Sequence, residues 1–284
     1  MIGIYLLEQL AAFQEYGTLS ESAEHLHLSQ PSLSRSMQKL EKQLGVKLFE
    51  RHKNKLILND TGILAASYAS RILADEAEME TQIALHVRNK TALSIGSCAP
   101  GPLMNILPSL AGRCSEMTVS SDLTTEEELL KGLYANQYQM IILNHPVSSE
   151  EYTSTEYVTE HLYLSVNRMH PAASYHSITF KEMDGQNFIM YAKVGVWDAL
   201  VQKKMPHAKF FRQENLEALS EITDNSDLPS FATDIALHYQ SDRHSNRITI
   251  PFSDSDASIT FYIICKVSAD SRLKQIIRQI ISAV

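Results

Sequence analysis

The sequence is poor in cysteine and glycine, and each shortage argues against a class of protein. Three cysteines in 284 residues lie far apart without Cys-x-x-Cys spacing, so neither a disulfide framework nor a zinc site is encoded. Ten glycines are about half the usual ~7%, and neither GxGxxG nor GxxxxGK[ST] occurs, which argues against phosphate-cradling nucleotide folds. No apolar run approaches the ~20 residues of a membrane span, and no signal-peptide core is present. We expect a cytoplasmic protein in a reducing compartment.

The remaining composition is that of a globular protein with more than one domain. A hydrophobic fraction of 44% with 20% charged residues allows real cores, and 284 residues exceed the roughly 100–200 of one domain. The formal net charge of -8 would usually argue against nucleic-acid binding. Residues 35–55, however, carry seven lysines and arginines against two glutamates. This basic cluster reverses the inference for the N-terminal region.

The first 45 residues predict a helix-turn-helix. The helices are expected at residues 4–16, 21–26 and 30–44, from the spacing of their apolar residues. Gly17 ends the first helix, and either Thr18 or Ser20 can cap the second. Ser29 caps the third helix, and Pro31 falls in its first turn, where a missing N–H costs nothing.

The third helix has one apolar and one polar face. Leu33, Met37, Leu40 and Leu44 fall within about 60° on a helical wheel and predict the buried stripe. Arginine can bond guanine, glutamine can pair with adenine, and serine or lysine can hold phosphates. The side chains that we expect to contact DNA from this region are Ser20, Ser29, Gln30, Pro31, Ser32, Ser34, Arg35, Gln38 and Lys39. The alternative is an ordinary surface helix, since charge opposite a leucine stripe is common.

A small basic hairpin is predicted after Gly45, which can stop the third helix. Residues 47–51 and 55–59 alternate around a polar turn. A basic hairpin tip beside a recognition helix is typical of a winged helix-turn-helix. We expect Arg51, Lys53 and Lys55 to contact backbone phosphates.

These residues carry a resemblance to a known family. The pattern consists of Ala23 with Leu26, Ser29-Gln30-Pro31, Ser34-Arg35, Leu40-Glu41, Leu44-Gly45, Leu48-Phe49-Glu50-Arg51 and Gly62. Over residues 18–62 the chain resembles the head of a LysR-type transcriptional regulator. Two departures occur: Ser22 stands where the family usually has alanine, and residues 59–62 replace a Leu-Thr-x-Ala-Gly ending.

A long helix is predicted over residues 60–88, which contain no proline. Its apolar stripe consists of Leu64, Tyr68, Ile72, Met79, Ile83 and Val87. A helix of about 27 residues would reach roughly 40 Å and must bury that stripe against a partner. The resemblance implies a dimerising linker helix, and the alternative is a helix in the core of a domain.

The remainder predicts a two-part α/β region. Strands at residues 92–96, 117–121 and 140–143 alternate with helices at 102–111 and 126–134, which indicates a parallel sheet. A second unit follows, with strands at 162–166, 188–191, 248–252 and 259–265, helices at 196–204 and 215–224, and an amphipathic helix at the end of the chain. The resemblance implies two Rossmann-like lobes joined by two crossovers. Residues 135–140 lack the glycine and aspartate that are common in the family before the third strand, and residues 227–230 lack its Gly-x-Gly.

The expected fold is therefore a multi-domain α/β protein with an N-terminal all-α winged helix-turn-helix, a linker helix and a two-lobed Rossmann-like effector domain. The expected boundaries are 1–60, 61–89 and 90–284, with the first lobe at about 90–161 and 267–284 and the second at about 162–266. A ligand in such a sheet binds beyond the carboxyl ends of the strands, against helix N-termini. The candidates are Ser97, Cys98, Pro100, Gly101, Thr124, Thr125, Asn144 and Lys193.

Two of these candidates have a competing interpretation. Thr124 or Thr125 can be merely the N-cap of the following helix. Cys98 lies where a helix N-terminus would stabilise a thiolate, so a redox sensor is conceivable, but a small buried residue is the favoured interpretation.

The functional hypothesis is a sequence-specific DNA-binding regulator of the LysR type, controlled by a small-molecule effector of unknown identity. Its expected partners are double-stranded DNA, a second copy through the linker helix with a tetramer as the full assembly, and RNA polymerase, without a membrane. No catalytic residue, metal or resident cofactor is expected. One alternative is a regulator whose sensor domain serves assembly only. Another is an α/β enzyme or solute-binding module with an incidental helical head, which the missing catalytic and signal motifs disfavour.

Overall fold

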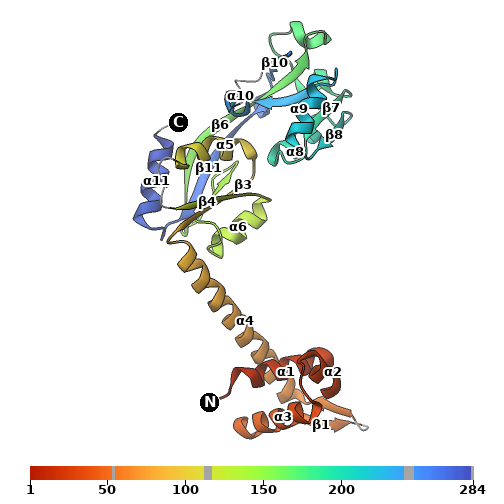
Figure 1. The fold of residues 1–284 in the computed structure, drawn as a ribbon, viewed down its shortest axis with the longest axis vertical. Helices are drawn as coiled ribbons and strands as arrows, with labels where there is room; N and C mark the ends of the chain where they lie inside the picture. The colour runs from red at the N-terminus through yellow and green to blue at the C-terminus, as the bar shows by residue number, and fades with distance from the viewer. Residues whose placement is uncertain (53–54, 112–116, 240–245, 283–284) are drawn as a thin grey trace. The chain divides into compact units, whose positions relative to one another are not determined.

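The computed structural model describes residues 1–52, 55–111, 117–239 and 246–282 (Figure 1). The chain divides into two compact units, Met1–Ala84 and Leu85–Val284, which are described separately. Lys53 of the expected hairpin and Cys114, one of the three cysteines, lie outside the described residues.

The first unit is a three-helix head with a β-hairpin. Its elements are α1 (Ile4–Tyr16), α2 (Leu19–His25), α3 (Gln30–Leu44), β1 (Phe49–His52), β2 (Lys55–Leu58) and the first part of α4 (Asp60–Arg88). The strands β1 and β2 pair in antiparallel fashion, so the predicted hairpin is confirmed. The second helix begins earlier than expected because Thr18 caps it, accepting a hydrogen bond from the Glu21 N–H. Ser29 caps α3 in the same way, as predicted.

The core of the head is built mainly from the predicted stripes. Leu6, Leu10, Leu33 and Leu40 are fully buried and form one apolar cluster. The predicted burial of Leu44 is wrong, since 39% of this residue is exposed. It is the last residue of α3, and the chain turns away at Gly45, which has a left-handed backbone.

Glu41 closes the turn between α3 and the hairpin. Its Oε1 accepts hydrogen bonds from the backbone N–H groups of Leu48 and Phe49 at 2.9 and 3.2 Å. The Lys47 ammonium lies 2.9 Å from Oε2. Burial alone would raise the pKa of Glu41, but Lys47 and the two N–H groups hold it below its ordinary value. One carboxylate thus fixes the start of the wing.

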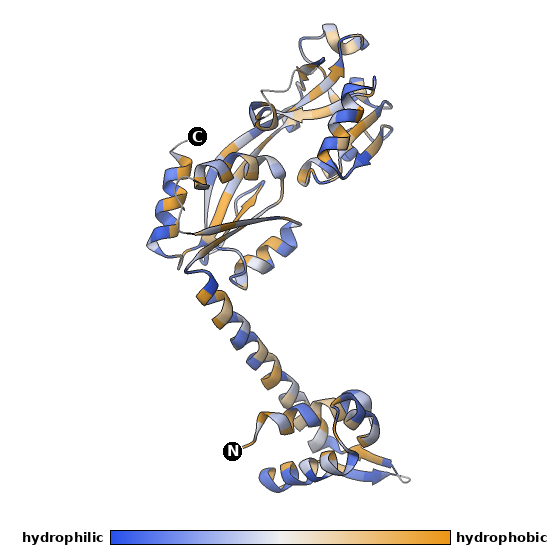
Figure 2. Ribbon diagram, in the orientation of Figure 1, coloured by the Kyte–Doolittle hydropathy of each residue, from blue (hydrophilic) through white to orange (hydrophobic). Residues whose placement is uncertain are grey.

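The helix α4 packs only its small residues against the head. Gly62, Ala66 and Ala69 are buried there, and a Cβ on Gly62 would overlap the Leu48 carbonyl. The predicted apolar stripe is exposed instead: Ile83, for example, keeps 58% of its surface accessible. Orange and blue bands alternate along this helix in Figure 2. A helix in the core of a domain is therefore the wrong interpretation, and burial against a partner stays a prediction.

The second unit begins with the predicted parallel sheet. The strands β3 (Ala92–Ser97), β4 (Thr118–Leu123) and β5 (Met140–Leu143) are parallel, with helices α5 (Pro100–Ala111) and α6 (Glu126–Tyr134) between them. The long strand β6 (Tyr152–Asn167) and β11 (Ser258–Lys266) are antiparallel to each other, and β11 also pairs with β5. The helix α11 (Ser271–Ile281) returns to this lobe, burying Leu273, Ile276, Ile277 and Ile280. The two long strands are the crossovers that the resemblance implied.

The second lobe is built on the far half of β6. It contains α7 (Phe180–Met183), β7 (Asn187–Tyr191), α8 (Val196–Lys204), β8 (Lys209–Gln213), α9 (Leu216–Asp224), β9 (Ser230–Thr233), α10 (Asp234–Tyr239), β10 (Arg247–Pro251) and the short 3-10 helices Pro171–Ser174 and Ser255–Ala257. Both β9 and β10 pair with β6, while β7 and β8 form a separate parallel pair. Stacked phenylalanines, Phe188 with Phe231 and Phe180 with Phe252, fill the interior. The sequence prediction missed β8, β9, α7 and α10, and it recognised only the end of β6.

An arginine organises the turn that departs from the family pattern. The Arg247 guanidinium donates to the carbonyls of Thr223, Ser165 and Leu228 at 2.6, 2.7 and 2.8 Å. These bonds hold residues 224–230 against β6. A side chain thus fixes a turn that lacks the usual glycines.

The Glu41 contacts lead to a prediction for the head. Glu41→Gln removes the negative charge that accepts two backbone hydrogen bonds and pairs with Lys47. The loss should lower the local stability by about 1–2 kcal/mol. Hydrogen exchange at the amides of Leu48 and Phe49 should accelerate roughly 5–30-fold in the full chain. The matched control is Glu50→Gln, on the exposed face of β1, which should leave that exchange unchanged. Equal exchange in the wild type and in Glu41→Gln would contradict this role.

Candidate functional site

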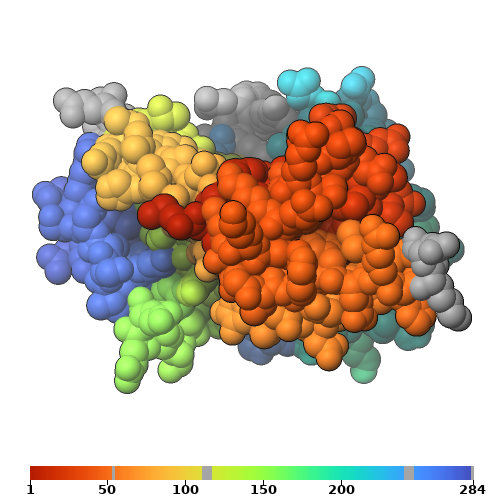
Figure 3. Space-filling model, turned by 90° about the horizontal axis from the view of Figure 1, so that it is seen from below, coloured from red at the N-terminus to blue at the C-terminus, as the bar shows by residue number. Residues whose placement is uncertain are grey.

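The N-terminal half of α3 presents the predicted polar face to solvent. Gln30, Pro31, Ser32, Arg35 and Gln38 are exposed, and Ser34 is half-buried. Exposure follows from the helical period, because Leu33, Met37 and Leu40 occupy the buried side. Figure 3 shows the outer surface of this unit in red to orange. The predicted base-reading residues therefore lie on one accessible helix face.

The remaining candidates of the head surround this helix. Ser20 is exposed in the first turn of α2, and the exposed Ser29 uses its hydroxyl to cap α3. Arg51 and Lys55 are exposed on the hairpin. Neither they nor Arg35 makes an ion pair within the part of the chain that the structure describes. Three cations thus remain free to meet phosphates or base edges.

Lys39 is the exception among the cationic candidates. Its ammonium donates a hydrogen bond to the Tyr5 hydroxyl of α1 and lies 5.3 Å from the centre of that ring. The side chain is exposed but already held by the head. To contact a phosphate, the Lys39 ammonium would have to give up its hydrogen bond to Tyr5 or make both contacts at once.

The effector candidates of the first lobe gather at the carboxyl ends of β3, β4 and β5. The Ser97 carbonyl accepts from the Thr124 N–H, and the Cys98 N–H donates to the Ile142 carbonyl. The Ser97 hydroxyl bonds the Ala99 carbonyl at 2.7 Å. Ser97, Cys98 and Gly101 are buried, while Pro100 and Thr124 are half-buried. The structure brings these candidates together, but much of their polar surface is already used within the protein.

The second lobe closes directly over this cluster. The Cys98 carbonyl accepts a hydrogen bond of 3.0 Å from the Val196 N–H, at the start of α8. A Cβ on Gly195 would overlap that carbonyl, and its φ of 62° also favours glycine. The two lobes therefore touch backbone to backbone at the predicted ligand position.

The other candidates lie at the periphery. Thr125 is the N-cap of α6 and accepts from the Glu128 N–H at 3.4 Å, so its capping interpretation is confirmed. Asn144 and Lys193 are exposed. A backbone hydrogen bond links Asn144 to the Cys98 sulfur, whereas no described contact brings Lys193 to the cluster.

Cys98 is a buried thiol. Burial is the largest effect on this group and raises the pKa of Cys98 to about 12. A thiol with that pKa is not ionised near neutral pH and is a poor nucleophile. The structure supports the interpretation of Cys98 as a small buried residue.

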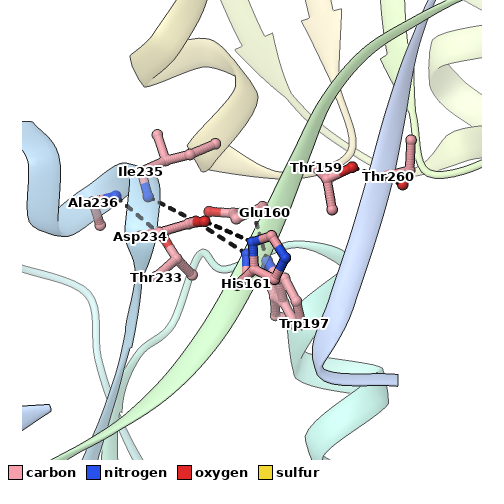
Figure 4. Close-up of polar contacts among 9 residues, drawn as sticks. All are labelled: Thr159, Glu160, His161, Trp197, Thr233, Asp234, Ile235, Ala236 and Thr260. Atoms are coloured by element: carbon pink, nitrogen blue, oxygen red, sulfur yellow. Dashed lines mark hydrogen bonds and ion pairs between the residues drawn. The ribbon is translucent and has the colours of Figure 1, made fainter. Parts of the chain in front are cut away.

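The residue that the sequence prediction missed is Glu160. It lies on β6 with 1% of its surface exposed, and its Oε2 accepts from the Trp197 indole N–H at 2.8 Å (Figure 4). The Thr233 hydroxyl also bonds this carboxyl, and a Cβ on Gly101 would overlap it. Burial raises the pKa of Glu160, against the lowering effect of these two hydrogen bonds. A protonatable group of the protein thus occupies the junction of the lobes.

The neighbouring polar groups link β6 to α10. Asp234 accepts from the backbone N–H of His161 at 3.0 Å and from its imidazole Nδ1 at 2.7 Å. Asp234 also accepts from the Ile235 N–H, and the Thr233 hydroxyl accepts from the Ala236 N–H (Figure 4). These bonds fix the segment that carries Thr233 beside Glu160.

Two family models match the chain. The model of the bacterial regulatory helix-turn-helix protein, lysR family, matches residues 4–63, and the model of the LysR substrate binding domain matches residues 91–283. The chain belongs to the LysR family. The first match contains the whole exposed face of α3, and the second contains both lobes.

Individual relatives of the family are distant. The chain is 29% identical over 188 residues to the Hca operon transcriptional activator HcaR of Escherichia coli, covering 64% of this chain and 63% of that protein. It is 26% identical over 188 residues to the hydrogen peroxide-inducible genes activator of Haemophilus influenzae, covering 65% and 62%. The chain therefore aligns with less than two thirds of the length of these curated relatives.

Solved structures of the family share the fold. Full-length OxyR from Pseudomonas aeruginosa is 20% identical with a TM-score of 0.55, covering 99% of this chain and 100% of that one. Full-length BenM is 19% identical with a TM-score of 0.52, covering 99% and 97%. The predicted order of a helix-turn-helix head followed by a two-lobed α/β region is thereby confirmed.

Two features are absent from the described part of the chain. Across residues 1–52, 55–111, 117–239 and 246–282, no helix is long and apolar enough to cross a bilayer. In the same ranges, no three or more His, Cys, Asp and Glu side chains gather as metal ligands.

The raised pKa of Glu160 predicts how stability depends on pH. A carboxyl whose folded-state pKa is raised stabilises the fold below its unfolded pKa, and this stabilisation is lost as pH rises through the folded value. The free energy of unfolding of the second unit, measured by urea unfolding with Trp197 fluorescence, should therefore contain a component that falls as pH rises above about 4.5, by up to about 1.4 kcal/mol per pH unit.

Glu160→Gln should remove this component because the amide stays neutral at every pH. Glu156→Gln, at an exposed position of the same strand, is the control and should retain the slope of the wild type. A pH dependence of the free energy of unfolding that is unchanged by Glu160→Gln would refute the assignment.

Proposed function

We propose that the chain is a sequence-specific DNA-binding transcriptional regulator of the LysR type that works as a homo-oligomer in the cytoplasm under the control of a small molecule bound between its lobes. The observation that carries the proposal is the exposed polar face of α3, which lies between the capping Ser29 and the basic hairpin. A helix with arginine and glutamine on its free side, next to cations on a wing, has the chemistry of major-groove recognition.

The regulatory role is supported by the names of relatives. They include a transcriptional activator of the Hca operon, a RuBisCO operon transcriptional regulator and a hydrogen peroxide-inducible genes activator. For this chain we propose domains at residues 1–60, 61–89 and 90–284, and DNA contacts through the candidates of α3 and the wing. RNA polymerase is a further proposed partner, since regulators at promoters act on it.

The burial of Cys98 does not favour peroxide sensing through a thiolate at this position. Cys98 and Cys265 are buried free cysteines, and burial keeps Cys98 protonated. Oxidation requires thiolate character and access, which Cys98 lacks.

Self-association is proposed through α4. Six large apolar side chains of this helix, from Leu64 to Val87, are each at least 44% exposed. An exposed apolar stripe of this length is typical of helices that pair with another helix. A dimer through α4, further assembled as a tetramer, would cover it.

One observation favours an alternative to control by an effector. The backbone contact between Cys98 and Val196, together with the buried Glu160, fills the predicted ligand position in this structure. This observation favours the second candidate function, a regulator whose sensor region serves assembly only. A ligand that changes DNA affinity would decide for effector control.

The DNA proposal predicts two distinct losses. Arg35→Ala should weaken binding by about 1–3 kcal/mol mainly at one base pair, because a fork of two donors to guanine is lost. Arg51→Ala should weaken all sequences alike and reduce the slope in log salt by about one. Fluorescence anisotropy of the full chain on the fragment upstream of its own gene, with single-base variants and a salt series, measures both. Lys181→Ala, on α7, is the control, and uniform loss for Arg35→Ala would sink the base-reading role.

The oligomer proposal predicts a matched pair of variants on α4. Ile83→Glu places a charge in the apolar stripe and should raise the dissociation constant of self-association at least about tenfold, since about 1.4 kcal/mol suffices. Thr81→Glu puts the same charge on the opposite side of the helix and should have little effect. Sedimentation equilibrium of the full chain gives both constants. Equal association of the two variants would place the interface elsewhere.

A further inference from the structure

Glu160 is a buried carboxyl group that has no cationic partner among the described residues. Its hydrogen bonds come from the neutral indole of Trp197 and the neutral hydroxyl of Thr233. The charged group that acts on it is another acid, Asp234. Buried carboxylates in proteins are normally paired with a cation, because removing an unpaired charge from water is energetically costly.

Asp234, which acts on Glu160, and an acid on each of the helices α6 and α8 have partners of their own. Asp234 pairs with His161 at 2.7 Å, Glu126 with His145 at 3.0 Å, and Asp198 of α8 with Arg212 at 2.8 Å. Those basic groups are therefore engaged elsewhere. Within the described part of the chain, no cationic side chain pairs with Glu160.

The carboxyl also occupies a particular place in the cleft. It lies against Gly101, in the first turn of α5, so closely that a Cβ there would overlap it. The free N–H groups of a helix N-terminus are where an anionic ligand would be expected to bind. With Glu160 in that place, an organic anion would meet both a steric block and a like charge at low dielectric constant.

We propose that Glu160 determines the charge of the ligand that this cleft admits, excluding organic anions and selecting a small organic cation such as an amine, amidine or guanidine. The inference rests on the proposed control by a ligand between the lobes. A separation of the lobes to admit the ligand would break the hydrogen bonds of Glu160 with Trp197 and of Cys98 with Val196. A cation then provides the missing partner of the carboxylate, and the indole of Trp197 is a second group that attracts cations.

The test uses two ions of equal shape and opposite charge, acetamidinium and acetate, titrated into the full chain at constant ionic strength. Isothermal titration calorimetry measures binding, and the emission of Trp197, the single tryptophan, locates it at the cleft. Acetamidinium should bind the wild type with a saturable change in emission, and acetate should not. Glu160→Gln should weaken acetamidinium at least tenfold, whereas Glu160→Asp, which keeps the charge, should retain the preference.

Glu156→Gln is the control on the same strand and should behave as the wild type. Saturable binding of acetate to the wild type, or equal binding of acetamidinium to the wild type and Glu160→Gln, would overturn the proposal. Binding of neither ion to any variant would overturn it as well.

A parallel anisotropy measurement on the upstream DNA fragment separates the two proposals. If the wild type and Glu160→Gln bind DNA while neither ion binds, only the ligand inference fails, and the assembly-only alternative is favoured. If the wild type does not bind DNA, the proposed regulatory function fails, and the calorimetry still decides the role of Glu160.

Discussion

The junction of the two lobes depends on a carboxyl group held out of water by neutral donors. Glu160 contributes from the strand that crosses between the lobes, and Trp197 reaches it from α8. Its burial requires glycine at position 101, just as the neighbouring contact between Cys98 and Val196 requires glycine at 195. Two glycines in a chain that has few of them are thus placed at the contacts around this junction.

The two buried glutamates have different surroundings, and their pKa values shift in opposite directions. Glu41 in the head accepts hydrogen bonds from two backbone N–H groups and pairs with Lys47. Its pKa is therefore lowered, and it remains a fixed structural anion. Glu160 receives hydrogen bonds but no cation among the described residues, and its pKa is raised. Glu41 already has a cationic partner, whereas Glu160 would be stabilised as a carboxylate by an added positive charge.

Much of the fold could be predicted because local patterns and tertiary structure agree. The caps Thr18 and Ser29, the buried Leu33 and Leu40 and the parallel strands β3 and β5 all follow from residue type and spacing. Leu44 was misplaced because the helical period does not show that the chain turns away from the core directly after it, at Gly45. The strands β8 and β9 are short, and they are defined by pairing with distant segments.

The site was predicted less completely than the fold. The strand ends indicated Ser97, Cys98 and Gly101, but no spacing rule shows that a second lobe closes on them. Glu160 did carry a signal, since it shares the inward period of Leu162 and Leu164 on β6. A charged residue at an inward strand position calls for a partner. That partner, Trp197, lies 37 residues away in sequence and is visible only in the folded chain.

Closure of the lobes also constrains what a ligand must provide. A ligand shifts the equilibrium between open and closed lobes only by its difference in affinity for the two. The closed form already has the Cys98 to Val196 hydrogen bond and the Glu160 to Trp197 hydrogen bond. An anion that entered the cleft would break these two hydrogen bonds and would also be repelled by the Glu160 carboxylate. A cation would exchange a neutral donor for an ion pair, which is the stronger kind of hydrogen bond, so the energetic balance of this cleft differs with the sign of the ligand's charge.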